Sequence, residues 1–386
     1  MIETKGIVAS IIAFFLLVLG LYNRRINRVF SPTLVVGMRN KVFDITYIAI
    51  FAFFWVFGVC VTDSYDIGNY RWAFDARVSH GKEPLFDVIQ FFFHDIGWSF
   101  DLFKGIWFSV VVILLYRSIR RYSKTPGAVA GLALITVFMG YITQMRNALV
   151  MAIFLNAFLL LLSQKRRDKI LYLVIVLLSA QIHTIAYAFL VFLFISPRDN
   201  RVLKRLFYII ITVATFFVFL LPAFFTQAMH FILNQLSIDE TNVARVLSFF
   251  QGDGISYRYA FFLICKHLLL FLLTDRACGI QMNNVSDTFE KQRYSILRNS
   301  NTLMLLFLPI TLLAPSFERL FNCFVLIQYA MVFNVGKEKV SLPKVSLNIS
   351  LQFIMVVGIL CITFVEWFFS PVDLITILNS LECFLI

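Results

Sequence analysis

Three short polar segments interrupt long apolar runs, and each places ionisable side chains at the interruption. Arg146 lies in "YITQMRNALVMA", His183 in "SAQIHT", and Glu318 and Arg319 in "APSFER". A guanidinium can hold phosphate oxygens through two parallel N–H groups, and an imidazole can take up a proton near neutral pH. Charged residues at helix breaks inside a membrane commonly mark a functional site. The competing interpretations are arginines that extend to lipid headgroups and a hydrogen-bonded core histidine.

The composition indicates a polytopic membrane protein that is all-α. Of the 386 residues, 60% are hydrophobic and 15% are charged, whereas soluble domains have about 25% charged residues. We expect one integral membrane domain over residues 1–386, with a first helix at 6–22 that is retained rather than cleaved. Twelve membrane spans are predicted, at 6–22, 42–61, 103–116, 126–143, 147–163, 170–182, 184–197, 206–225, 257–274, 300–314, 319–335 and 347–369.

The basic residues are concentrated in alternate loops, which predicts the orientation of the chain. Most of the 34 Lys and Arg residues lie in six loops, at 23–41, 117–124, 164–169, 198–205, 275–298 and 336–346. We expect these loops in the cytoplasm, and 62–102, 226–256 and both termini outside. The net charge of +12 is then a topology signal, and we expect no nucleic-acid partner.

Three of the apolar stretches are read as hairpins of short helices with polar tips facing outward. Residues 170–197 have basic flanks on both sides, so both flanks should lie on the same side of the membrane. A helix of about 13 residues rises about 20 Å, less than the apolar core of about 30 Å. His183 should therefore lie below the outer surface, in a protein-lined or watery cavity. The stretches 126–163 and 300–335 repeat this pattern.

The outer segments combine groups that suit a sugar substrate. Residues 63–86 mix carboxylates with aromatic rings, although an interfacial aromatic belt is the competing explanation. Residues 85–96 have helical apolar spacing, which predicts a helix lying in the outer interface. Residues 226–256 are long enough to form a lid, with Arg245 as a phosphate contact.

Soluble catalytic motifs and metal-ligand spacings are absent from the sequence. It has no Walker A, GxSxG, HExxH or GxGxxG motif, and its six cysteines form no CxxC pair. We therefore expect no cofactor and no metal, and chemistry within the membrane on a lipid-borne substrate from the outer side.

Several of these segments resemble the EpsG family of Wzy-type polysaccharide polymerases. The similar motifs are "YDIGNYRWAF" with "EPLF", "MRNALVMA", "AQIHTIAYAF" and "FERLFNCFVLIQY", across roughly residues 40–335. One departure is Asn147, where the family more often has Gln. The resemblance implies a bacterial cytoplasmic-membrane enzyme, compatible with a GT-C-like glycosyltransferase architecture. It would join undecaprenyl-diphosphate-linked oligosaccharide units on the outer face for a capsule, exopolysaccharide or O-antigen, with a flippase and a chain-length regulator as partners.

Such a reaction needs a cationic group for the diphosphate and a base for the acceptor hydroxyl. Arg146 and Arg319 are the cationic candidates, and Asp66, Glu83 and His183 are unranked candidates for the base. The other residues expected to contact substrate are Asp63, Tyr65, Asn69, Tyr70, Gln144, Arg245, Arg258 and Glu318.

Three other functions remain open at this point. A flippase would need a charged cavity open to both sides, and only Lys266 and His267 lie away from the outer cluster. A membrane O-acyltransferase would use a histidine that is reachable from the cytoplasm. A scaffold would not explain charged helix breaks.

Overall fold

The computed structural model describes residues 36–62, 64–79, 81, 83–197, 201–220, 257–313, 317–335, 339–341 and 348–369. The chain divides into two compact units, one formed by Met1–Phe194 with Val325–Ile386 and the other by Ile195–Phe324. The expectation of a single domain stays a prediction. The predicted first span at 6–22 and the predicted lid at 226–256 lie outside the described residues.

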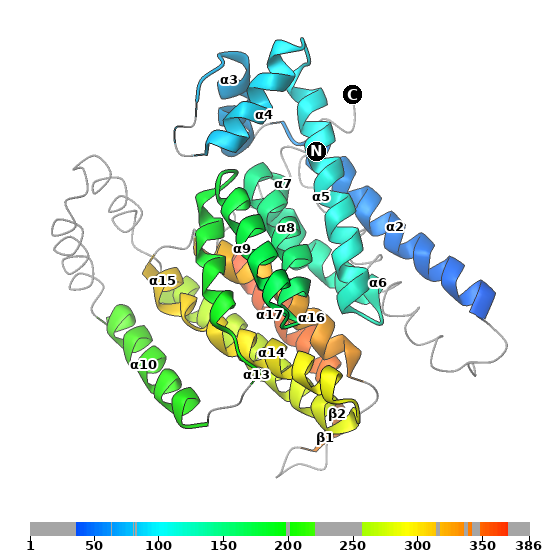
Figure 1. The fold of residues 1–386 in the computed structure, drawn as a ribbon, viewed down its shortest axis with the longest axis vertical. Helices are drawn as coiled ribbons and strands as arrows, with labels where there is room; N and C mark the ends of the chain where they lie inside the picture. Colours follow the sequence, from blue (N-terminus) through cyan, green and yellow to red (C-terminus); the bar gives the residue numbers. More distant parts are fainter. Residues whose placement is uncertain are drawn as a thin grey trace. The chain divides into compact units, whose positions relative to one another are not determined.

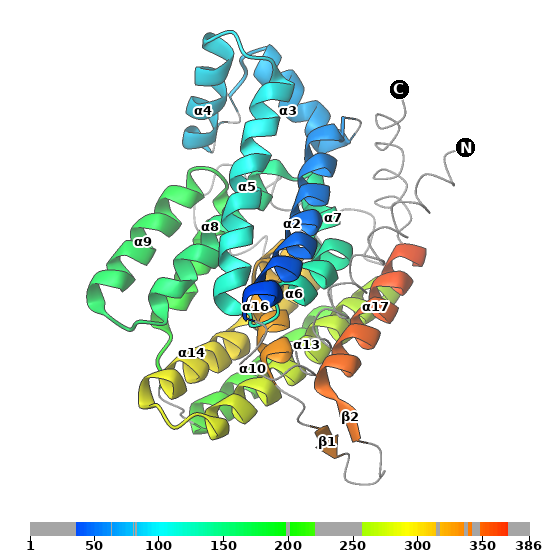
Figure 2. The same cartoon turned by 90° about the vertical axis from the view of Figure 1, so that its right-hand side faces the viewer.

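The first unit is a set of helices packed around α5. Its helices are α2 (Val36–Cys60), α3 (Tyr65–Asp75), α4 (Pro84–Asp95), α5 (Phe100–Tyr122), α6 (Pro126–Ala133), π-helix η1 (Leu134–Phe138), α7 (Met139–Ile142), α8 (Met145–Leu161), α9 (Arg166–Ala180), 3-10 helix η2 (Thr184–Phe194) and α17 (Leu351–Phe369). Figure 2 shows α9, α8, α5 and α2 side by side in this order. The pair α3 and α4 lies beside the beginning of α5 (Figure 1).

The second unit contains α10 (Arg201–Leu220), α13 (Tyr257–Asn284), α14 (Thr288–Met304) and α15 (Phe307–Leu313). Helix α16 (Glu318–Asn334) begins in this unit and ends in the first, with the division after Phe324. Helices α13 and α14 pack against each other, and Arg298 on α14 pairs with Asp275 on α13 through two contacts of 2.6 and 2.8 Å.

The helix breaks that position the ionisable residues are confirmed. Helix α7 ends at Ile142 and α8 begins at Met145, so Arg146 is the second residue of a new helix. Helix α9 ends at Ala180 and η2 begins at Thr184, which leaves His183 at the tip of a hairpin of two short helices. Short polar segments between apolar runs are therefore sufficient to predict these breaks.

Membrane spanning is supported by one helix of sufficient length in the described part of the chain. Helix α5 has 23 residues and is long and apolar enough to cross a bilayer, a criterion that buried core helices of soluble proteins also meet. Helix α9 exposes an apolar stripe formed by Ile170, Val174 and Leu178, which is typical of a lipid-facing surface. The full set of twelve spans stays a prediction.

Two details of the predicted fold are wrong. The expected loop 275–298 is mostly helical, because α13 continues to Asn284 and α14 begins at Thr288 with Asp287 as its cap. Its charges pair across two helices, as Asp275 and Arg298 do, rather than marking a loop. The helix predicted at 103–116 starts earlier, where the Ser99 side chain accepts a hydrogen bond from the Leu102 N–H, and it ends later, at Tyr122.

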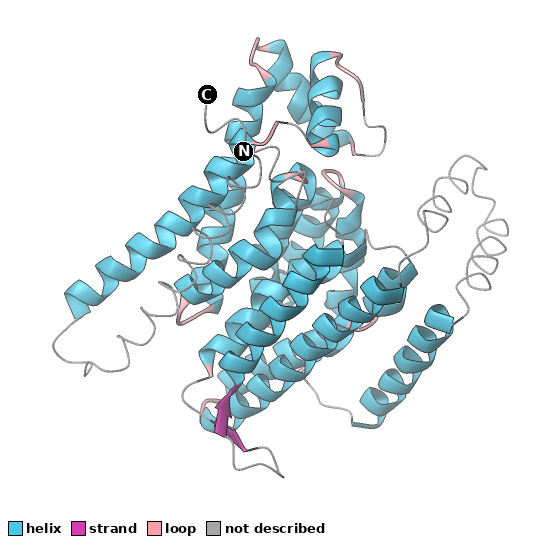
Figure 3. Ribbon diagram, turned by 180° about the vertical axis from the view of Figure 1, so that it is seen from behind, coloured by secondary structure: helices cyan, strands magenta, loops and turns pink. Residues whose placement is uncertain are grey.

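The all-α class is confirmed, since helices make up the described fold apart from one small hairpin. The described residues include one antiparallel hairpin of two short strands, β1 (Lys339–Ser341) and β2 (Asn348–Ser350), which immediately precedes α17 (Figure 3). Backbone pairing joins Val340 to Ile349, and so short a hairpin leaves little sequence signal.

Candidate functional site

Glu83 is a buried carboxylate at the start of α4, and its backbone position is set by the tip of the α9–η2 hairpin. It is the N-cap residue of α4, yet its side chain makes no capping hydrogen bond. The first N–H groups of a helix need other acceptors. Here the Leu85 and Phe86 N–H groups donate to the Gln181 carbonyl at 3.1 and 3.3 Å. The Glu83 side chain is therefore directed away from its own helix.

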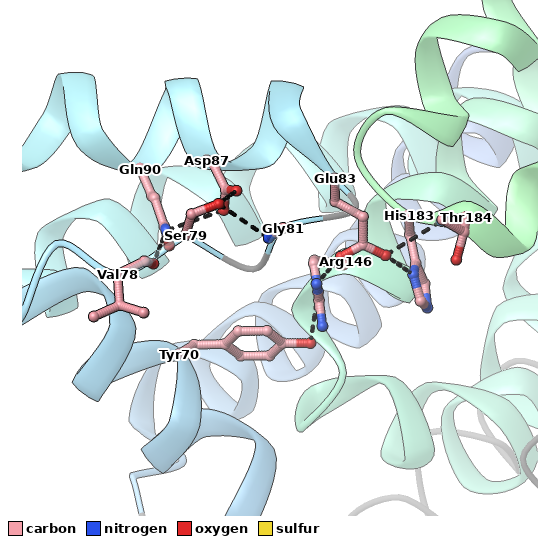
Figure 4. A network of polar contacts seen from close by, with 10 residues as sticks. All are labelled: Tyr70, Val78, Ser79, Gly81, Glu83, Asp87, Gln90, Arg146, His183 and Thr184. Carbon is pink, nitrogen blue, oxygen red and sulfur yellow. Dashed lines mark hydrogen bonds and ion pairs between the residues drawn. The ribbon is translucent and has the colours of Figure 1, made fainter. Parts of the chain in front are cut away.

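The two oxygens of Glu83 bind two different cationic or ionisable side chains (Figure 4). Oε2 pairs with Nη1 of Arg146, and Oε1 accepts a hydrogen bond from Nδ1 of His183. Oε1 also accepts the backbone N–H of Thr184 at 3.2 Å. The carboxylate thus joins the start of α4, the start of α8 and the hairpin tip.

Arg146 is held in place on several sides by protein groups. Its Nε donates to the Tyr70 hydroxyl at 3.1 Å, and the guanidinium carbon lies 4.9 Å from the centre of the Tyr70 ring. It also lies 5.4 Å from the centre of the Phe86 ring, and such cation–π contacts fix the plane of an arginine. The side chain is 18% exposed, which disfavours the interpretation that it extends to lipid headgroups. Its Nη2 makes no hydrogen bond with a residue in the described part of the chain.

The contact with Glu83 defines the chemistry of His183. A carboxylate only accepts hydrogen bonds, so Nδ1 of His183 must carry the proton that it donates. In the neutral ring, Nε2 is then the nitrogen with the basic lone pair. An acidic residue that orients a histidine in this way also stabilises the imidazolium after proton uptake.

The sequence profile of the EpsG family matches residues 45–379. The chain belongs to the EpsG family. This family comprises membrane-associated, Wzy-like polysaccharide polymerases. Comparisons with curated proteins and with solved structures returned no match.

The structure of this EpsG-family protein separates the three candidate bases. Glu83 and His183 contact each other, whereas Asp66 lies in the first turn of α3 and its side chain makes no hydrogen bond or ion pair with a described residue. Glu83 is occupied by Arg146, which disfavours it as a proton acceptor. His183 is therefore the base that the geometry favours.

The expected substrate contacts have different outcomes. Tyr70 lies against Arg146, and Gln144 accepts a hydrogen bond from the Asn147 amide at 3.0 Å. Asn69 is exposed on α3. The backbones of Asp63 and Arg245 and the side chains of Tyr65 and Arg258 lie outside what the structure describes.

The second unit of this EpsG-family protein contains its own cluster of buried charges. Lys266 on α13 donates to Oε1 of Glu318 at 2.5 Å, and Nε2 of His267 lies 3.9 Å from the same oxygen. The His267 ring stacks on Phe321 with 3.9 Å between ring centres. Arg319 is the second residue of α16 and belongs to this unit. A cavity shared by Arg319 with Arg146 and His183 therefore stays a prediction.

The site residues that the sequence analysis missed are Phe86, which lies against Arg146, and Thr184, which binds Glu83 through its backbone. A backbone donor leaves no signal in the residue type, whereas Phe86 belongs to the motif "EPLF". Within the described residues, no group of three His, Cys, Asp or Glu side chains is arranged to hold a metal ion.

Proposed function

We propose that this EpsG-family protein joins undecaprenyl-diphosphate-linked oligosaccharide units by glycosyl transfer on the outer face of the bacterial cytoplasmic membrane. The observation that carries the proposal is the shared carboxylate of Glu83, which contacts both Arg146 and His183. A phosphate-binding cation and a base are thereby held next to each other, as this reaction requires.

In the proposed reaction, the acceptor hydroxyl oxygen attacks the anomeric carbon of the growing glycan. A new C–O bond forms, and the bond between that carbon and the diphosphate oxygen breaks with its electron pair on the diphosphate. The hydroxyl proton moves to Nε2 of His183. Atoms and charge balance without any co-reactant.

Arg146 is assigned to the leaving diphosphate. Nη2 and the second N–H of Nη1 can bind two phosphate oxygens while Glu83 and Tyr70 keep their contacts. Charge on the leaving oxygen grows in the transition state, so a pre-positioned cation stabilises that state more than the bound substrate. Glu83 supports both steps, because it orients Arg146 and then neutralises the imidazolium of His183.

The outward orientation rests on the basic loops, and the depth of the site in the membrane rests on the surface of α4. Val88, Phe92 and Ile96 are 63%, 59% and 47% exposed and lie one helical turn apart. Such a stripe suits a helix at the lipid interface. This stripe supports a position of the Glu83 site, at the beginning of α4, near the headgroups, where a lipid diphosphate is found. A flippase and a chain-length regulator are the proposed partners.

The test is the glycan of a strain that lacks this protein, analysed on a gel and by mass spectrometry of the lipid-linked material. The proposal expects loss of polymer with single repeat units retained at the outer face. Accumulation of lipid-linked units facing the cytoplasm would instead indicate a flippase. Chains of normal length that lack acetate would indicate an O-acyltransferase.

A further inference from the structure

Asp87 is a second buried carboxylate on α4, one helical turn after Glu83, and the proposed reaction does not use it. The residue is 5% exposed. Its backbone N–H donates to the Glu83 carbonyl at 3.2 Å, so the two residues begin the same helix. A buried carboxylate is costly unless its oxygens receive hydrogen bonds. The groups that donate hydrogen bonds to the Asp87 carboxylate therefore indicate which part of the chain it holds in place.

Two donors to Asp87 come from the connection between α3 and α4 and from the next turn of α4 (Figure 4). The Ser79 hydroxyl donates to Oδ2 of Asp87 at 2.5 Å, and the Gln90 amide donates to Oδ1 at 3.3 Å. The Gly81 N–H donates to the Ser79 hydroxyl at 3.0 Å, and the Gln90 amide also reaches the Val78 carbonyl at 3.3 Å. Asp87 thus links Ser79 to α4 directly, and it is connected to Gly81 through Ser79 and to Val78 through Gln90.

The turn needs such support because its backbone is unusual. Arg77 and Gly81 have positive φ values of 53° and 74°, and a non-glycine residue in that region is strained. Glu83 itself has φ −132° and ψ 66°, which differ from the common extended cap, and it makes no side-chain cap bond.

We propose that Asp87 is a positioning residue for Glu83. Its hydrogen bonds to Ser79 and Gln90 hold Val78, Ser79 and Gly81 in the arrangement that directs the Glu83 carboxylate at Arg146 and His183. Asp87 does not touch the substrate, and it acts only through Glu83. The inference rests on the function proposed above and assigns a supporting role to a carboxylate outside the reacting groups.

The test measures the initial rate of polymer formation by purified protein in nanodiscs. Each rate is divided by the amount of protein that elutes as a single folded peak in size-exclusion chromatography. Asp87→Asn keeps the size of the side chain but removes the charge and one of the two acceptor oxygens, so it cannot accept from both Ser79 and Gln90. The rate should fall about tenfold, as expected for the loss of one charge-assisted hydrogen bond. Ser79→Ala should cause a similar loss, and Ser79→Thr, which keeps the hydroxyl, should restore the rate. Asp75→Asn removes an exposed carboxylate at the end of α3 and serves as the matched control.

A double-mutant cycle separates positioning from independent effects. If Asp87 acts through Glu83, Asp87→Asn should change the rate less than about twofold in a Glu83→Gln background. Additive losses, or a wild-type rate for Ser79→Ala, would overturn the positioning role. A wild-type rate for Glu83→Gln alone would instead overturn the proposed reaction site, so the two failures are distinguishable. If Asp87→Asn does not fold, the comparison of Ser79→Ala with Ser79→Thr tests the proposal in its place.

Discussion

Glu83 and His183 are 100 residues apart in the chain, and Oε1 of Glu83 accepts a hydrogen bond from Nδ1 of His183. The other oxygen of the same carboxylate pairs with Arg146. One carboxylate thus contacts an imidazole and a guanidinium from separate helix breaks, the proposed proton acceptor and the proposed phosphate-binding cation.

Arg146→Lys should reduce polymer formation nearly as much as Arg146→Ala. Lysine keeps the charge but lacks the planar fork that can bind Glu83 and a phosphate together. We expect a loss of about 100-fold or more, comparable to removal of one preorganised donor to a developing anion. Chain length on a gel is the measurement. Arg71→Lys is the control, because Arg71 pairs with Asp101 at an exposed site. Wild-type chains from Arg146→Lys would show that only a positive charge is needed.

Tyr70 should act through Arg146 rather than through a sugar. Tyr70→Phe removes the hydroxyl that accepts from Nε and keeps the ring, so the rate should fall by about tenfold or less. Tyr70→Ala also removes the cation–π contact and should cost clearly more. Rates at saturating substrate distinguish the two variants. A large increase in KM for Tyr70→Phe with an unchanged kcat would support a substrate contact instead.

The sequence predicted the helix breaks and most of the residues of the site, but not their connections. Arg146 and His183 stand out because charged groups between apolar runs are rare, and Glu83 belongs to a segment rich in carboxylates. Their pairing depends on how the α4 start docks on the Gln181 carbonyl, which is a tertiary contact without a local signal. For the same reason the sequence could not rank the three bases or assign Tyr70 to Arg146.

Errors in the predicted fold have a related cause. Charged residues at 275–298 suggested a loop, yet Asp275 and Arg298 satisfy each other across two helices. The π-helix η1, between α6 and α7, was also not expected. Its five residues are apolar or small, with no break residue among them, so the pattern of hydrophobicity is that of an ordinary helix.

The Lys266–Glu318 pair should be important for stability. Both side chains are largely buried, with 8% and 15% exposure. Lys266→Met leaves a carboxylate without this cation and should lower the free energy of unfolding by about 3–5 kcal/mol. Lys266→Met with Glu318→Leu should recover much of the loss. Thermal unfolding in detergent measures both.

The matched control for this pair is Arg293→Met. Arg293 pairs with Glu290 at a site where both side chains are about one-third exposed, so the change should cost less than about 1 kcal/mol. A double variant that is no more stable than Lys266→Met alone would contradict the ion-pair explanation.

The predicted orientation can be tested by cysteine labelling in a variant without native cysteines. Cys361 is exposed and must be replaced first. Arg167 is the second residue of α9. Arg167→Cys should react only with reagent supplied to the cytoplasmic side. Asn69→Cys, on the exposed side of α3, should react only from outside. Labelling of Arg167→Cys from outside would reverse the orientation and place the Glu83 site in the cytoplasm.

The most direct test of the central claim is polymer formation by the purified protein in liposomes. The only substrate supplied is an undecaprenyl-diphosphate-linked repeat unit, without nucleotide sugars. The wild-type protein should produce a ladder of chain lengths and release undecaprenyl diphosphate in equal amount to the bonds formed. His183→Ala should lose about 100-fold or more in rate, as expected for the loss of a general base, while it elutes and unfolds like the wild type. A wild-type ladder from His183→Ala, or no ladder from the folded wild-type protein, would contradict the account.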